Sequence, residues 1–175
     1  MYSIQDRVPV SIVIANYNYA RFLRRSIDSA LEQNYDDTEV IVVDDASTDD
    51  TADVVASYGP RIKTRLREVN GGHAAAFNTG FASSSGKIVL FLDADDYLYP
   101  NAISEVVDAW EEKTAQMQFR LHIVDEHMHV KDVFPPSELP FDSGDVTPKL
   151  LRKGRYQTTV TSGLAFKRSV LDRIM

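Results

Sequence analysis

The chain has 175 residues, of which 43% are hydrophobic and 26% are charged, and this composition is ordinary for one globular domain with a substantial core. A formal net charge of −7 argues against a nucleic-acid partner bound through a broad basic surface. The absence of cysteine excludes disulfides and thiolate zinc sites. No apolar run approaches the ~20 residues of a transmembrane helix, and the first residues lack the pattern of a signal peptide. We therefore expect a soluble, cytoplasmic domain.

The first hundred residues alternate between predicted strands and helices. Apolar, β-branched runs predict buried strands, and spacings of three and four between apolar residues predict helices. We expect strands at 8–16, 39–43, 62–69 and 88–92, the third more exposed than the others. We expect helices at about 23–31, from an N-cap at Ser47 to Tyr58, at 73–82, and from Pro100 through Trp110. This order predicts a mostly parallel sheet with right-handed crossovers.

The rest of the chain has a different pattern. Residues 118–124 and 127–133 predict a hairpin, and 134–148 contain four prolines, which favour a long irregular loop. A last strand is expected at 160–167, followed by a helix over 168–175. That helix has no stop signal, so the chain is expected to be cut within a longer enzyme. His122, His127 and His129 resemble a ligand cluster, but no carboxylate pattern supports a metal site, so we favour an ordinary hairpin.

Three carboxylates, Asp93, Asp95 and Asp96, directly follow the apolar strand at 88–92. Ligands of open α/β sheets collect at the carboxyl ends of the strands. Aspartates at positions i and i+2 can reach one hard cation and the phosphate oxygens bound to it, and Mg²⁺ takes only one or two protein carboxylates in such sites. The alternative is that these residues are solvated loop acids, one of them capping the next helix.

Candidate ligand groups also follow the first and second strands. Tyr17 could stack on a base or be half-buried packing, and Asp44 and Asp45 could accept hydrogen bonds from a base or a ribose or serve the turn. The run Asn70-Gly71-Gly72 would let a helix N-terminus approach an anion, or would form a tight turn. Because parallel strands bring their carboxyl ends to one edge, these groups together predict a nucleotide site.

Taken together, these motifs resemble the family 2 glycosyltransferases of the GT-A fold. The resemblance rests on four segments in the family's order and approximate spacing, and on a weaker fifth. The four are VSIVIANYN (10–18), VVDDASTD (42–49), NGGHAAAFNTG (70–80) and FLDADD (91–96), and the fifth is SGLAFKRS (162–169). The resemblance covers nearly the whole chain. It implies one GT-A nucleotide-sugar-binding domain over 1–175, with a nucleotide half at about 1–100 and an acceptor-side part at about 101–175.

The resemblance also implies roles for individual residues. Ala15 and Tyr17 would line the base pocket, with Tyr17 stacked on the pyrimidine, and Asp45, with Asp44 as a second candidate, would hydrogen-bond the base. Asp93 would contact the ribose, and Asp95 would hold Mg²⁺ or Mn²⁺ on the diphosphate in the DxD motif. Gly72 and Asn78 lie where the family's third motif approaches the nucleotide.

The implied reaction is the inverting, metal-dependent transfer of a hexosyl group from a nucleotide-diphosphate donor, with UDP as the expected nucleotide. The acceptor would be a hydroxyl of a saccharide or a lipid-linked molecule, as in cell-envelope polysaccharide synthesis, and the enzyme could lie peripherally at the inner membrane face. The family's catalytic base follows the segment matched by 162–169, so it is expected beyond Met175 and no catalytic residue is nominated. The alternatives are a non-catalytic nucleotide-sugar-binding domain and, more remotely, a phosphatase of the DxD type.

Overall fold

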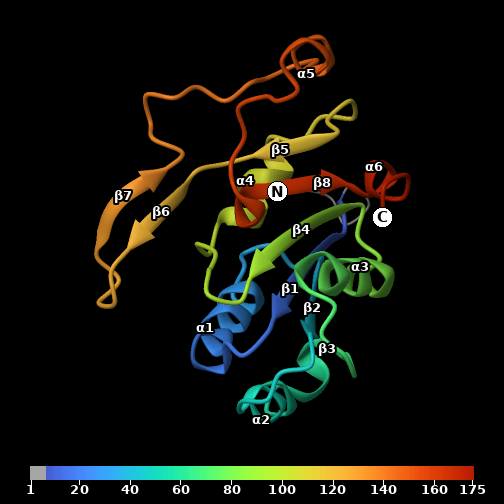
Figure 1. The fold of residues 1–175 in the computed structure, drawn as a ribbon, viewed down its shortest axis with the longest axis vertical. Coiled ribbons are helices and arrows are strands. Elements are labelled where there is room, and N and C mark those ends of the chain that lie inside the picture. Colours follow the sequence, from blue (N-terminus) through green and yellow to red (C-terminus); the bar gives the residue numbers. More distant parts are fainter. Residues whose placement is uncertain (1–6) are drawn as a thin grey trace. The chain divides into compact units, whose positions relative to one another are not determined.

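The computed structural model describes residues 7–175, which form two compact units. The first unit contains the chain up to residue 117 together with 165–175, and the second contains 118–164. The first unit holds the main sheet and its helices (Figure 1).

The main sheet has six strands in the order β3-β2-β1-β4-β8-β5. Its centre is β1 (Val10–Asn16), which pairs in parallel with both β2 (Thr38–Asp44) and β4 (Ile88–Asp93). On the outside of β2 lies β3 (Lys63–Leu66), also parallel, and on the outside of β4 lies β8 (Leu164–Lys167), which is antiparallel. The short β5 (Gln116–Gln118) forms the far edge. The predicted mostly parallel α/β sheet is confirmed.

Helices cover both faces of this sheet, because its central strands are apolar on both sides. One face packs on α3 (His73–Ser83) and α6 (Arg168–Leu171), in a core that contains Val13, Ile41, Phe77 and Phe91. The contact with α3 is close, since a Cβ added at Gly80 would lie 2.2 Å from Cγ1 of Val13. The connections α1 (Ala20–Leu31), α2 (Thr51–Ala56) and α4 (Ala102–Asp108), with a 3₁₀ turn at Gly59–Arg61, complete the helical elements of this unit. A second 3₁₀ turn, at Thr161–Gly163, lies in the second unit just before β8.

Several predicted boundaries in the first unit were wrong. Ser47 is not a helix cap: α2 begins four residues later, with Asp50 at its N-cap, because the Ser47 hydroxyl is bonded to Asp44 instead. The helix expected from Pro100 begins at Ala102 after an Asn101 N-cap. The third strand is only four residues long, and its Lys63 and Arg65 suit an exposed sheet edge.

The later part of the chain differs more from the prediction. The hairpin consists of β6 (Leu121–Val124) and β7 (Val130–Phe134), so it begins later than expected, and Gln118 lies instead in β5 of the main sheet. A helix that was not predicted, α5 (Thr147–Lys153), begins at the end of the region predicted as loop. The last strand begins at Leu164 rather than at 160, and α6 ends at Leu171. Among the described residues, no helix is long and apolar enough to cross a membrane.

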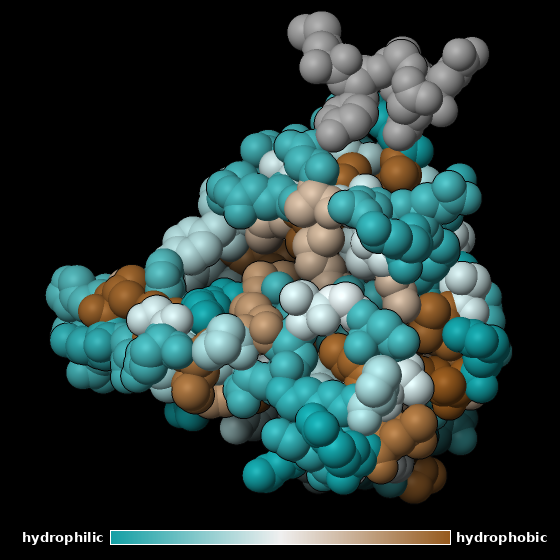
Figure 2. Space-filling view, turned by 90° about the horizontal axis from the view of Figure 1, so that it is seen from above, coloured by the Kyte–Doolittle hydropathy of each residue, from teal (hydrophilic) through white to brown (hydrophobic). Residues whose placement is uncertain are grey.

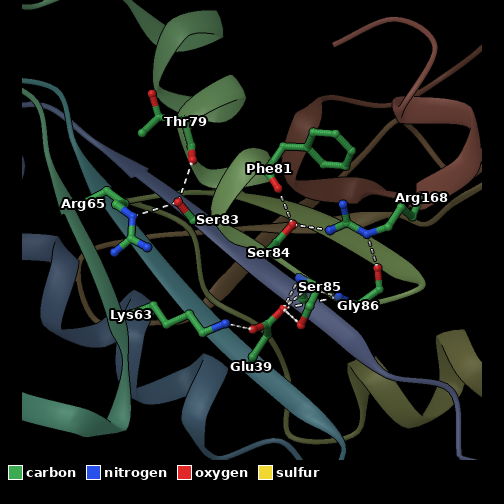
Figure 3. A network of polar contacts seen from close by, with 11 residues as sticks. Glu39, Lys63, Arg65, Thr79, Phe81, Ser83, Ser84, Ser85, Gly86 and Arg168 are labelled. Atoms are coloured by element: carbon green, nitrogen blue, oxygen red, sulfur yellow. Dashed lines mark hydrogen bonds and ion pairs between the residues drawn. The ribbon is translucent and has the colours of Figure 1, made fainter.

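A polar network closes the edge of the sheet at which the parallel strands begin (Figure 3). The Glu39 carboxylate of β2 accepts hydrogen bonds from the Ser11 hydroxyl at 2.6 Å, from the backbone N–H of Ser85 at 2.5 Å and from Lys63 Nζ at 2.5 Å. Gly86 N adds a bond to the Ser11 hydroxyl at 2.8 Å. Glu39 thus joins β1, β2 and β3 to the turn before β4. Burial alone would raise the pKa of Glu39, but the hydrogen bonds from Lys63, Ser11 and Ser85 outweigh it and lower the pKa to about 2.

We predict that Glu39→Gln destabilises the protein by about 2 kcal/mol at pH 7, after allowance for partial solvent screening of this half-buried group. Because the pKa of Glu39 is lower in the folded state, its contribution is fully present above the unfolded-state value of about 4.5 and is lost as the pH falls toward about 2. Urea denaturation of both proteins should therefore give a difference that falls by about half between pH 7 and pH 3. The exposed Glu112→Gln is the control, and a pH-independent difference at Glu39 would contradict the assignment.

Candidate nucleotide site

A cavity of about 550 Å³ lies at the carboxyl edge of the parallel strands. The ends of β1, β2 and β4 and the N-terminus of α3 supply its walls. Its lining consists of Ala15, Asn16, Tyr17, Tyr19, Asp45, Asn70, Gly72, His73, Ala76, Asp93, Ala94 and Asp95. Aromatic, small and acidic side chains are thus combined in one concave site, as in pockets for polar small molecules that carry an aromatic ring.

The structure brings six of the eight predicted site residues together. These six line the cavity and are Ala15, Tyr17, Asp45, Gly72, Asp93 and Asp95. Asp44 and Asn78 are not part of this lining: Asp44 is buried behind it, and Asn78 is exposed on α3. All the lining residues belong to the first unit.

Asp44 is held in a buried polar network instead of facing the cavity. Its Oδ1 accepts from Asn16 Nδ2 at 3.0 Å and from the Ser47 hydroxyl, and its Oδ2 accepts from the backbone N–H of Ser47 at 3.1 Å. Asn16 Nδ2 also lies 2.9 Å from the Thr51 hydroxyl. Because an ionised carboxylate only accepts, the Asn16 amide must present its NH₂ to Asp44, which fixes the orientation of the amide. Asp44 therefore anchors the loop after β2 to the end of β1.

A second set of contacts fastens the same two loops above this network. Asn18, which has a positive φ of 55°, donates its backbone N–H to the Ser47 hydroxyl at 2.8 Å. Its side-chain Oδ1 accepts from the backbone N–H of Thr48 at 2.8 Å, and Asp49 Oδ2 accepts from Ala20 N at 2.9 Å. The loop that carries Tyr17 is thus held by the loop after β2, so the tyrosine projects from a fixed backbone.

Asp45 is the most deeply buried carboxylate of the cavity, with a side chain only 3% exposed. Arg67 Nε donates to its Oδ1 at 2.6 Å. The backbone N–H of Gly72 donates to Oδ2 at 2.7 Å, and that of Gly71 lies 3.1 Å from both oxygens. The carboxylate therefore holds the Asn70–Gly72 loop in place, and Gly72 there adopts a φ of 81° that suits glycine.

Arg67 extends this arrangement to α3. Its Nη1 donates to the Thr79 hydroxyl at 2.7 Å, and the Thr79 hydroxyl donates to the Ala75 carbonyl at 2.9 Å. A planar guanidinium can make these bonds in several directions at once, which a lysine ammonium cannot reproduce. The ends of β2 and β3 and the first turns of α3 are thereby fixed relative to one another.

His73 and Asp93 meet across the cavity. His73 Nε2 lies 2.6 Å from Asp93 Oδ1, and the imidazole is edge-on to the Phe77 ring with centroids 4.2 Å apart. Phe77 in turn packs on Phe91 of β4, with centroids 4.6 Å apart. Asp93 is thus oriented by a histidine that rests on the core.

Asp95 differs from the other two acids of the cavity. It is exposed, and among residues 7–175 its carboxylate makes no hydrogen bond or ion pair. The described residues also contain no group of three or more His, Asp or Glu side chains arranged to hold a metal ion. One open carboxylate beside a second, Asp93, fits Mg²⁺ or Mn²⁺, which take hard oxygen ligands and obtain most of them from water and substrate phosphates. It does not fit a metal enclosed by protein ligands.

Two of the three histidines noted in the sequence, His127 and His129, lie in the turn of the predicted hairpin, where their backbone amides are hydrogen-bonded. Asp125 Oδ1 accepts from the backbone N–H of His127 at 2.9 Å and of His129 at 3.0 Å, and Asp125 Oδ2 lies 2.8 Å from Lys131 Nζ. The aspartate thus shapes the turn between β6 and β7.

Three functional candidates were missed in the sequence: Asn16, Arg67 and His73. Asn16 and His73 lie inside matched motifs. Asn16 stands between the predicted site residues Ala15 and Tyr17, and His73 directly follows Gly72, so both could have been named as candidates from the sequence. Arg67 had no local signal, because its partner Asp45 is 22 residues away in sequence.

Comparison with known proteins places these motifs in a described family. Residues 11–174 match the family described as "Glycosyl transferase family 2". An uncharacterized glycosyltransferase of Nostoc sp. (strain PCC 7120) is 35% identical over 170 residues, which cover 94% of this chain and 52% of the relative. The chain therefore spans about half the length of this curated relative.

Solved structures share the fold. Staphylococcus aureus TarS residues 1–349 in complex with UDP is similar with a TM-score of 0.54 and 28% identity, over 57% of this chain and 31% of that one. The mannosyltransferase PcManGT from Pyrobaculum calidifontis, in complex with GDP-Man and Mn²⁺, has a TM-score of 0.67 and 23% identity, over 96% of this chain and 47% of that one. The predicted GT-A fold is confirmed.

We predict that Arg67→Met lowers the free energy of unfolding by about 2–3 kcal/mol, because it leaves the buried Asp45 carboxylate without its cation. Arg67→Lys should recover only part of this loss, since it keeps the charge but not the planar set of donors. Arg65→Met, two residues earlier in β3, is the matched control, because Arg65 is exposed and bonds to Ser83 Oγ and its neighbour's carbonyl. Urea denaturation of the three variants measures the effect, and equal losses at positions 65 and 67 would refute it.

Proposed function

Because the chain belongs to glycosyl transferase family 2, we propose that its cavity binds the nucleotide diphosphate of a nucleotide-sugar donor, with UDP as the nucleotide. The protein would transfer the sugar to an acceptor hydroxyl of a saccharide or lipid-linked molecule. The observation that carries this proposal is that one cavity combines an exposed aromatic ring just after β1 with the carboxylates of Asp93 and Asp95 at the end of β4.

The base would lie between the ends of β1 and β2. Tyr17 is 47% exposed and can stack on a pyrimidine ring, while Ala15 leaves room for the ring beside it. Three N–H donors already use both oxygens of Asp45, with the Gly71 amide shared between them. We propose that Asp45 mainly fixes the glycine loop and that an N–H of the base would share its Oδ2 with these amides. The nearby Gly72 would leave space for the nucleotide backbone.

The ribose and the diphosphate would lie toward β4. Asp93 has its Oδ1 bonded to His73, and we place a ribose hydroxyl as a further donor to this carboxylate. Asp95 would hold Mg²⁺ or Mn²⁺ together with phosphate oxygens. Such an ion, when bound, neutralises charge that develops on the leaving diphosphate. Asp44 and Asn78 are left out of this proposal, because neither lines the cavity.

Inversion at the anomeric carbon stays a prediction. It requires a carboxylate base on the acceptor side, and the cavity acids Asp45, Asp93 and Asp95 are all committed to the donor in this proposal. No base is assigned among them. The acceptor and the donor sugar are likewise not assigned.

We predict that UDP with Mn²⁺ raises the melting temperature of the protein more than UDP alone. At a ligand concentration 100 times the dissociation constant, the stabilisation is about 2.7 kcal/mol, which a thermal-shift measurement detects easily. Asp95→Asn should remove the part of the shift that depends on Mn²⁺ and preserve the part that UDP produces alone. Asp53→Asn, an exposed acid on α2, is the control. A Mn²⁺-dependent shift that survives Asp95→Asn would overturn the metal assignment.

We predict that Tyr17→Ala weakens UDP binding about three- to tenfold without changing the Mn²⁺ dependence, because it removes only the stacking surface. Isothermal titration with UDP, with and without Mn²⁺, measures both quantities. Tyr99→Ala is a matched control, since Tyr99 is 46% exposed and lies outside the cavity lining. If the two variants bind UDP equally well, the base does not lie on Tyr17.

A further inference from the structure

The second unit contains a helix that contributes no side chain to a core. In α5, the residues Thr147–Lys153 include no buried residue. Leu150 is 42% exposed, and Leu151 is 82% exposed. Helices in globular proteins are ordinarily stabilised by packing of an apolar face, which α5 lacks within the described residues.

Local contacts hold α5 in place instead. Asp145 Oδ1 accepts from the backbone N–H of Thr147 at 2.9 Å, and a proline lies in the first turn. At the other end, Gly154 has a left-handed conformation and donates its N–H to the Leu150 carbonyl at 2.8 Å. Lys149 Nζ lies 2.6 Å from Asp142 Oδ2. These contacts define the helix without burial of its side chains, and its leucines are exposed to solvent.

The side chains of α5 separate into two faces. At about 100° per residue, Leu150 and Leu151 lie on one side of the helix, and Lys149, Arg152 and Lys153 are centred on the opposite side. Arg155 follows directly after the helix. A short helix with exposed leucines opposite a set of cations has the pattern of an interfacial helix, in which long basic side chains extend from the apolar boundary toward charged headgroups.

The charge of this segment opposes that of the whole chain. Residues 147–155 contain four Lys or Arg and no Asp or Glu, whereas the chain has a net charge of −7. Within residues 7–175, neither Arg152 nor Arg155 forms an ion pair. Figure 2 shows a face of the molecule on which hydrophobic side chains are exposed among hydrophilic ones.

We propose that α5 docks the protein on the surface of an anionic lipid bilayer, with Leu150 and Leu151 at the acyl boundary and Arg152, Lys153 and Arg155 at the headgroups. The combination of apolar and cationic groups favours this occupant. A second copy of the chain would place like charges against each other, and a nucleic acid would meet the acidic remainder of the chain. The proposal does not depend on the identity of the nucleotide in the cavity.

Co-sedimentation with vesicles tests the proposal. Vesicles of phosphatidylcholine with about 30% phosphatidylglycerol should bind the protein, and vesicles of phosphatidylcholine alone should bind it much more weakly. The double variant Arg152→Gln/Lys153→Gln should lower the partition coefficient about 25-fold, from a factor of about five for each cation. Leu150→Ser/Leu151→Ser should lower it by at least about tenfold.

Matched controls separate docking from general surface effects. Ile174→Ser removes an apolar side chain of similar exposure (72%) outside α5, and Lys113→Gln/Arg173→Gln removes two exposed cations. Both controls should retain binding, and all variants should keep the wild-type melting temperature, because α5 contributes no side chain to a core. Equal binding to neutral vesicles, or equal losses in the controls, would overturn the proposal. A leucine variant that changes the sedimentation coefficient without lipid would also overturn it, because the face would then be a contact between copies.

Discussion

The candidate nucleotide site depends on one buried carboxylate. Asp45 joins the end of β2 to Arg67 beyond β3 and to the amides of Gly71 and Gly72. A carboxylate in such a place would be destabilising without a cation and donors, and these three partners supply both. Through Arg67 and Thr79 the same charge fixes the start of α3, and α3 carries His73 into the cavity. The geometry of the Asn70–Gly72 loop at the candidate site is therefore a consequence of the hydrogen bonds to Asp45.

A second carboxylate, Asp44, likewise holds loops in place, between β2 and β1. Asp44 is the last residue of β2 and Asp45 the first after it, and only Asp45 lines the cavity. Asp44 turns toward Asn16 and Ser47 and fastens the loops after β1 and β2. Part of what looks like a binding motif in the sequence is thus a scaffold. The distinction matters for mutagenesis, because loss of Asp44 would act through the loops rather than through contact with a ligand.

The sequence was sufficient for the parallel sheet and for six of the lining residues, because these follow from local properties. Apolar runs predict buried strands, and parallel strands share a carboxyl edge, so the sequence alone predicts that Tyr17, Asp45 and Asp95 lie close together, as they do in the cavity. Contacts between residues far apart in the sequence could not be predicted in this way. The role of Arg67 depends on an acid 22 residues away, and Ser47 looked like a helix cap until Asp44 was found to bind its hydroxyl. The second unit was predicted least well, because it has fewer buried residues and its helix α5 has no apolar stripe facing a core.

The different surroundings of the three cavity acids also explain why Asp95 is the carboxylate to which we assign the proposed metal ion. Asp45 is neutralised by Arg67, and Asp93 is oriented by His73, so each already has a partner within the protein. Asp95 is exposed and has none among residues 7–175, and its charge is balanced only when a cation or solvent approaches from the cavity. A site of this kind binds a metal weakly by itself and more strongly with a diphosphate that completes the coordination. Metal and nucleotide should then bind with positive coupling, each raising the affinity for the other by the same factor.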